Sequence, residues 1–131
     1  MSWYQGSDLK KPSGGEKGRY RKKRKYELGR PPTLTKLGES EERRFVRVRG
    51  GNHKIRLKKA VYVNVAIPAE GRSRKVKILD VIETPSNPQY AKSNIITKGT
   101  IVRTEIGIVK ITSRPGQDGT LNGILVESST R

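Results

Sequence analysis

The chain has 131 residues, enough for one small domain with a long extension, and its 29 Lys and Arg against 12 Asp and Glu give a net charge of +17. It has no cysteine, which excludes a disulfide framework and a thiolate metal site. No apolar run is long enough for a membrane span or a signal peptide. Composition therefore favours a polyanion such as nucleic acid as the partner, over a membrane surface.

Aliphatic residues divide the chain into two regions. Residues 1–44 contain four leucines and no Ile, Val or Phe, whereas residues 45–126 contain twenty-six Ile, Leu, Val or Phe. Ordering the backbone costs about 1–2 kcal/mol per residue, and the first region has too little apolar surface to offset that cost. We therefore expect an arm over residues 1–44, extended or disordered in the free protein, and a folded body over residues 45–131.

The stretch GRYRKKRKYELGR, residues 18–30, concentrates the charge of the arm. It has no apolar stripe, and cations one helical turn apart, such as Arg19 and Lys23, disfavour a free helix. Phosphates would remove this repulsion, and Tyr20 and Tyr26 could stack on unpaired bases. A solvated arm and a localisation tag are the alternatives. We predict RNA contacts for Lys17, Arg19, Tyr20, Arg21, Lys22, Lys23, Arg24, Lys25, Tyr26 and Arg30.

The body has the pattern of short strands separated by turn residues. We expect strands over residues 45–49, 53–58, 61–67, 76–82, 95–96, 101–102, 108–111 and 121–126. Gly50-Gly51-Asn52 predicts a hairpin between the first two, and a slip of the apolar phase at 79–82 indicates a bulge or a strand buried on both faces. Asn122-Gly123 is a competing turn signal in the last strand. The fold predicted is mainly β, a small antiparallel β-barrel of about six or seven strands with a long basic N-terminal extension.

The predicted hairpin, residues 43–59, carries a second group of cations and no acidic residue. Strand alternation places its valines with Ile55 and Leu57 on a core face, and its cations on the opposite face. Side chains on one strand face repeat about every 6.6–6.8 Å, close to the phosphate spacing of a single strand. An ordinary solvated sheet face is the alternative. We predict RNA contacts for Arg47, Arg49, His53, Lys54, Arg56 and Lys58.

The remaining motifs give no sign of an active site. The single histidine, His53, has no second histidine, cysteine or carboxylate cluster near it in sequence, so we expect no metal site. Neither a Walker-type phosphate loop nor a dinucleotide-binding glycine pattern occurs. We expect no catalytic residue and no cofactor. The segment TSRPGQDGT, residues 112–120, predicts a tight double turn, with Arg114 placed to reach a backbone phosphate.

Three stretches resemble small-subunit ribosomal protein eight of the archaeal and eukaryotic type, in its short archaeal form. They are RYRKKRKYELGRPPTLT (residues 19–35), RVRGGNHKIRLKK (residues 47–59) and IITKGTIVRTEIGIVKITSRPGQDGTLNGILVE (residues 95–127). They span most of the chain in the family's order. The resemblance adds Arg114 to the RNA-contact candidates. It also favours a continuous last strand, since family members usually have a small residue such as alanine at the position of Gly123.

The resemblance implies a cytoplasmic structural constituent of the small ribosomal subunit, with a β-barrel body and a basic extension threaded into small-subunit ribosomal RNA. Its partners would be this RNA and neighbouring small-subunit proteins, with no membrane and no small-molecule substrate. A transient ribosome-assembly or RNA-processing factor, built on a small basic RNA-binding barrel, is the alternative.

Overall fold

A computed structural model describes residues 3–129 of the chain. These residues form two compact units, which divide between Pro32 and Thr33. The first unit contains the short strands β1 (Trp3–Tyr4) and β2 (Leu28–Gly29), which pair in antiparallel, and the 3₁₀ turn η1 (Lys25–Glu27). All remaining elements belong to the second unit.

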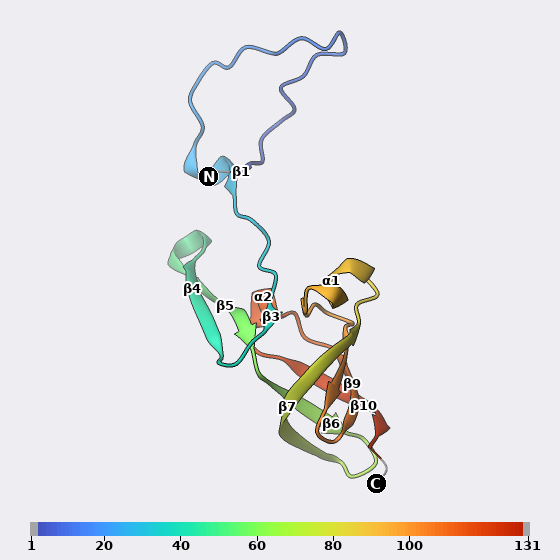
Figure 1. Ribbon diagram of the computed structural model, residues 1–131. Helices are drawn as coiled ribbons and strands as arrows, with labels where there is room; N and C mark the ends of the chain where they lie inside the picture. Colours follow the sequence, from blue (N-terminus) through green and yellow to red (C-terminus); the bar gives the residue numbers. More distant parts are fainter. Residues whose placement is uncertain (1–2, 130–131) are drawn as a thin grey trace. The chain divides into compact units, whose positions relative to one another are not determined.

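The second unit contains a closed barrel of five strands: β6 (Tyr62–Ile67), β7 (Arg72–Glu83), β8 (Ile101–Thr104), β9 (Gly107–Ile111) and β10 (Asn122–Ser128) (Figure 1). Consecutive strands pair in antiparallel, and β10 closes the barrel by pairing with β6 in parallel. The closing pair has to be parallel, because the first and last of five up-and-down strands run in the same direction. The fold is mainly β, as predicted, but the barrel has five strands rather than six or seven, and one pairing is parallel.

A three-stranded sheet accounts for the other strands of this unit. Its order is β3 (Lys36–Leu37), β5 (His53–Ala60) and β4 (Glu42–Arg47), and the 3₁₀ turn η2 (Arg49–Gly51) connects β4 to β5. The predicted hairpin is therefore confirmed, but it lies outside the barrel, and Figure 1 shows β4 extending away from the barrel strands. Residues 95–96 do not form the expected strand. They contribute only a single bridge, between Ile95 and Lys36.

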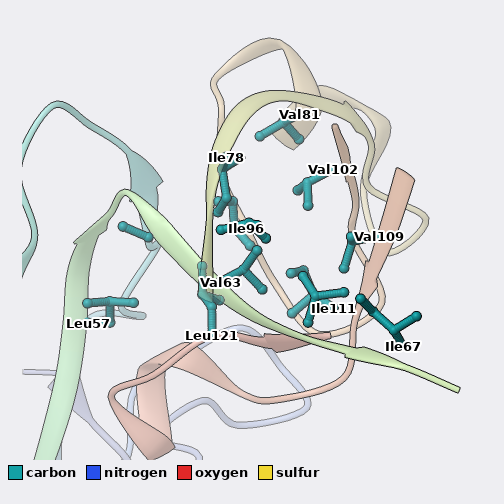
Figure 2. Close-up of a cluster of buried hydrophobic side chains, with 13 residues drawn as sticks. Leu57, Val63, Ile67, Ile78, Val81, Ile96, Val102, Val109, Ile111 and Leu121 are labelled. Atoms are coloured by element: carbon teal, nitrogen blue, oxygen red, sulfur yellow. The ribbon is translucent and has the colours of Figure 1, made fainter. Parts of the chain in front are cut away.

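The core of the second unit is built mainly from Val, Ile and Leu side chains, most of them from the barrel, and Figure 2 shows Leu57 of β5 beside the barrel. On β6 the alternation holds along the strand, with Val63, Val65 and Ile67 buried and Tyr62 partly exposed. Burying such side chains stabilises the fold by about 1.5–3 kcal/mol each. The core consists of Leu57, Ala60, Val63, Val65, Ile67, Val76, Ile78, Val81, Ile96, Val102, Val109, Ile111 and Leu121.

The long strand β7 contains the irregularity that its sequence predicts. Its pairing with β8 shifts register twice, between Ile78 and Asp80 and again between Val81 and Glu83. Ile78 and Val81 are therefore both buried although they are three positions apart, while Leu79 faces solvent. The apolar phase slip thus marks a bulge and not a strand buried on both faces.

The end of the chain settles two expectations. β10 runs without interruption through Gly123, which pairs with Ile111 on one side and Val65 on the other, so Asn122-Gly123 is not a turn. The predicted double turn at 112–120 is instead a single turn of helix, α2 (Pro115–Asp118), which ends at Gly119. A second short helix, α1 (Pro88–Lys92), precedes β8.

Within the second unit, hydrogen bonds hold the segment that precedes the hairpin, residues 33–41, against the rest of the unit. The buried Thr35 hydroxyl donates to the Leu57 carbonyl at 2.6 Å, and the Ile96 N–H donates to the Thr35 carbonyl at 2.7 Å. Leu37 donates to the Asn94 carbonyl at 2.9 Å. This segment is therefore held by hydrogen bonds on both sides, and Leu37 also packs against the buried core.

Candidate nucleic-acid interface

The first unit presents its cations on a long loop that starts and ends at the β1–β2 pair. The Gln5 N–H donates to the Glu27 carbonyl at 2.8 Å next to this pair, and the Lys17 N–H donates to the Leu9 carbonyl at 2.7 Å further along. Residues 10–26 are exposed throughout. The ten predicted contact residues of the arm are all on the surface: Lys17, Arg19, Tyr20, Arg21, Lys22, Lys23, Arg24, Lys25, Tyr26 and Arg30.

One carboxylate, Glu27, lies among the cations between Lys17 and Arg30. It accepts from the Arg24 backbone N–H at 3.2 Å and forms an ion pair with Arg21 at 2.6 Å. The Arg24 hydrogen bond, followed by that from Arg21, lowers the pKa of Glu27 below its ordinary value, so this side chain stays ionised at neutral pH. The hydrogen bond between Arg21 and Glu27 also raises the pKa of Arg21. Glu27 thereby fixes the end of the loop and neutralises one of its cations.

The tyrosines of the arm lie against its guanidinium groups. The Arg21 guanidinium is 5.1 Å from the centre of the Tyr20 ring and 5.8 Å from that of Tyr26. Tyr20 nevertheless remains 88% exposed and Tyr26 76% exposed. Most of each ring is therefore open to a base, as base–aromatic stacking requires.

The β4–β5 register determines which side chains share a face of the hairpin. Val46 lies opposite Lys54, and Phe45 lies opposite Ile55. Residues 48–52, an odd number, connect the paired strands. Odd-numbered residues of both strands therefore share one face of the hairpin, and even-numbered residues share the other. The predicted division into an apolar face and a cationic face is therefore wrong. Each face carries both kinds of residue.

Near its base the hairpin pairs its cations with carboxylates. Glu42 lies 3.0 Å from Lys58 and 3.7 Å from Lys59, and Glu41 lies 2.9 Å from Arg43. The hydrogen bond from Lys58 is the main cause that lowers the pKa of Glu42. Lys58, predicted to contact RNA, thus already has an anionic partner in the protein.

Further along the hairpin the surface is more open. Among residues 3–129, Arg44 and Arg49 have no carboxylate partner, and both are exposed. Arg47 and His53 face each other across the strands and are also exposed. Arg44 on β4 and Arg49 at the η2 turn are therefore hairpin cations available to a polyanion.

Helix α2 brings the Arg114 segment against the hairpin. Lys54 Nζ donates to Gln117 Oε1 at 2.6 Å, and Arg43 Nε donates to the Gly119 carbonyl at 3.0 Å. Arg114 itself is exposed at the start of α2, where its backbone N–H donates to Asp118 at 3.1 Å. Two sequence motifs more than fifty residues apart therefore lie side by side.

Arg56 differs from the other predicted contact residues of the hairpin because it is partly buried. One terminal nitrogen donates to the Thr33 hydroxyl at 3.2 Å, and the buried Nε has no hydrogen-bond partner among residues 3–129. The guanidinium therefore lies along the protein rather than extending into solvent.

The described residues offer neither a cluster of metal ligands nor a membrane-spanning helix. Within residues 3–129, His, Asp and Glu side chains form no group of three that could hold a metal ion. None of the helices found there has the length and apolarity needed to cross a membrane.

Comparison with known protein families identifies the family of the chain. The model of the family described as ribosomal protein S8e matches residues 4–126. The chain belongs to the S8e family. Three curated relatives, each named small ribosomal subunit protein eS8, match it nearly from end to end. The protein of Staphylothermus marinus is 71% identical over 97% of this chain and 99% of the relative. Those of Hyperthermus butylicus and Pyrobaculum calidifontis are 57% and 56% identical, over 97% and 96% of this chain and 94% and 97% of the relatives.

One feature of this S8e chain was not predicted from its sequence. The rings of Phe45 and His53 are stacked, with centroids 4.5 Å apart and planes at 28°, and Phe45 is 66% exposed. Strand alternation within β4 alone gives Phe45 no partner. The pairing becomes visible only when the register across the hairpin is known.

Proposed function

We propose that this S8e protein is a structural constituent of the small ribosomal subunit, in the cytoplasm, and that it binds small-subunit ribosomal RNA through the arm and the β4–β5 hairpin. The observation that carries the proposal is the match along nearly the whole chain to relatives named small ribosomal subunit protein eS8. Its partners would be this RNA and neighbouring small-subunit proteins. No catalytic residue, cofactor, membrane or small-molecule substrate is part of the proposal.

The charge distribution supports the RNA-binding part of the proposal. Between Lys17 and Arg30 the arm has eight cations and one carboxylate, and residues 43–59 have eight cations and no carboxylate. Cations that approach phosphates release condensed counterions, so both segments gain binding energy that does not depend on base sequence. Contacts of this kind position a protein on folded RNA, whereas exposed tyrosines can stack on unpaired bases.

Sedimentation of small subunits after washing in high salt tests the function. A constitutive component remains near one copy per subunit in mature, washed subunits. A transient assembly or RNA-processing factor, which is the alternative, is lost in the wash or is confined to precursor particles. Quantitative mass spectrometry of the two fractions measures the difference, and absence from mature subunits would contradict the proposal.

A further inference from the structure

The stacked Phe45–His53 pair is an exposed aromatic surface on a cationic hairpin. Phe45 is the single phenylalanine of the chain and His53 the single histidine. Phe45 remains 66% exposed, although burying such a side chain would contribute about 1.5–3 kcal/mol to stability. The barrel core gains nothing from this ring, since the ring is absent from the buried cluster. The stack therefore needs an explanation other than folding.

The residues around the stack define what it can accept. Ile55 lies opposite Phe45 on the same face and is 45% exposed, which extends the apolar surface by one side chain. Arg47 lies opposite His53 on this face of the hairpin. The result is a small exposed apolar surface of Phe45, Ile55 and the His53 ring, with Arg47 beside it.

We propose that Phe45 and His53 form a stacking platform for one unpaired base of small-subunit ribosomal RNA; this proposal rests on the function proposed above. RNA matches both the rings and the neighbouring cation, because a base offers a π face for stacking and the phosphates are anionic. The His53 ring holds the Phe45 ring in place, so little side-chain entropy is lost when a base binds. A protein partner would have to combine an apolar residue with an acidic rim, and the stacked rings add nothing to that recognition.

Binding of full-length variants to transcribed small-subunit ribosomal RNA tests the platform. Phe45→Leu keeps an apolar side chain but removes the ring, and it is expected to weaken binding by about ten-fold or more. Phe45→Tyr should bind as the wild type does. Tyr62→Leu is the matched control, because Tyr62 is a partly exposed aromatic residue on the barrel strand β6 that packs under Lys75, and it should leave affinity unchanged. Thermal unfolding checks that each variant is folded.

Salt dependence separates stacking from phosphate binding. Phe45→Leu is expected to keep the wild-type slope of log affinity against log salt, since it removes no phosphate contact. Replacing both Arg44 and Arg49 with glutamine should make the slope shallower by about 1.4 or more.

A fluorescence measurement reports stacking directly. The double variant Trp3→Phe/Phe45→Trp carries its one tryptophan on the platform. Its emission should be quenched when small-subunit ribosomal RNA is added, as expected when a base stacks on the indole. Unchanged emission with bound RNA would overturn the platform.

The outcomes distinguish this proposal from the function on which it rests. If wild-type protein binds the RNA and Phe45→Leu binds equally well, the platform is wrong and the proposed function stands. If Phe45→Leu keeps its RNA affinity but fails to enter subunits, the surface contacts a protein, which also overturns the platform. If the wild type does not bind the RNA, both proposals fail.

Discussion

At the scale of single residues, charge alone does not decide which cations are available. Lys58 is paired with Glu42, and the guanidinium of Arg56 is partly buried against Thr33. By contrast, Arg44 and Arg49 are exposed and have no carboxylate partner among residues 3–129. Losing a cation costs more RNA affinity where no carboxylate competes with phosphate for it, so Arg44 and Arg49 are expected to matter more than Lys58.

A substitution at Gly107 tests the close approach of β9 to β10. Gly107 has φ of 143° at the start of β9, and an added Cβ would overlap the Glu127 carbonyl oxygen. We expect Gly107→Ala to lower the free energy of unfolding by about 3 kcal/mol, from backbone strain and from this overlap. Chemical denaturation measures the change.

The matched control is Gly99→Ala, because Gly99 also has a positive φ, of 90°, but nothing lies within 4 Å of the added Cβ. It should cost only the backbone penalty, about 1 kcal/mol. Equal losses in the two variants would show that the overlap with Glu127 does not matter.

At the scale of elements, the arm and the barrel differ in how they are held. The β1–β2 pair contains two residues in each strand, and the loop between them has few backbone hydrogen bonds. The barrel strands are paired on both sides and contribute most of the buried cluster. Segments with few buried contacts open at low free-energy cost, so the arm should be the first part of the protein to yield to a protease.

Limited digestion with trypsin tests this difference and the role of the arm. In the free protein we expect the first cuts between Lys22 and Lys25, with the barrel surviving much longer. Addition of small-subunit ribosomal RNA should protect these sites, because the arm becomes ordered on phosphates. Mass spectrometry of the fragments locates the cuts.

Raising the salt concentration until the RNA is released provides the control, since the cuts should then return. Sites between Lys22 and Lys25 that stay accessible in an RNA complex shown to be intact would contradict the proposed role of the arm.

At the scale of the whole molecule, the net charge of +17 produces a field that attracts any polyanion. The field alone does not show which cations touch phosphate. With about eight phosphate contacts, the slope of log affinity against log salt for small-subunit ribosomal RNA should be near −6. Filter binding over a range of salt concentrations measures it.

Two variants with equal charge locate the contacts. Replacing Arg19, Arg21, Lys22 and Lys23 with glutamine should make the slope shallower by about 3. Replacing Arg72, Arg74, Lys75 and Lys77 on β7 with glutamine removes the same charge from the barrel. This variant should change the slope of log affinity against log salt less than the arm variant does. Equal changes would mean that total charge, and not the arm, determines binding.

Sequence alone determined the properties that depend on neighbouring residues. Two-residue alternation located most of the strands, the phase slip at 79–82 located the bulge in β7, and Gly50-Gly51-Asn52 located the turn of the β4–β5 hairpin. These features follow from side-chain direction and charge along a short stretch of backbone. Three family-like stretches likewise pointed to the S8e family, which the family match confirms.

Tertiary structure decided what depends on partners far apart in the chain. It determined that the barrel has five strands, that β10 closes it in parallel against β6, and that Lys54 of the hairpin meets Gln117 of α2. The register of the hairpin placed Phe45 on His53 in the same way. Local pattern does not encode these pairings, because a register shift of one residue exchanges the faces of a strand without changing its sequence.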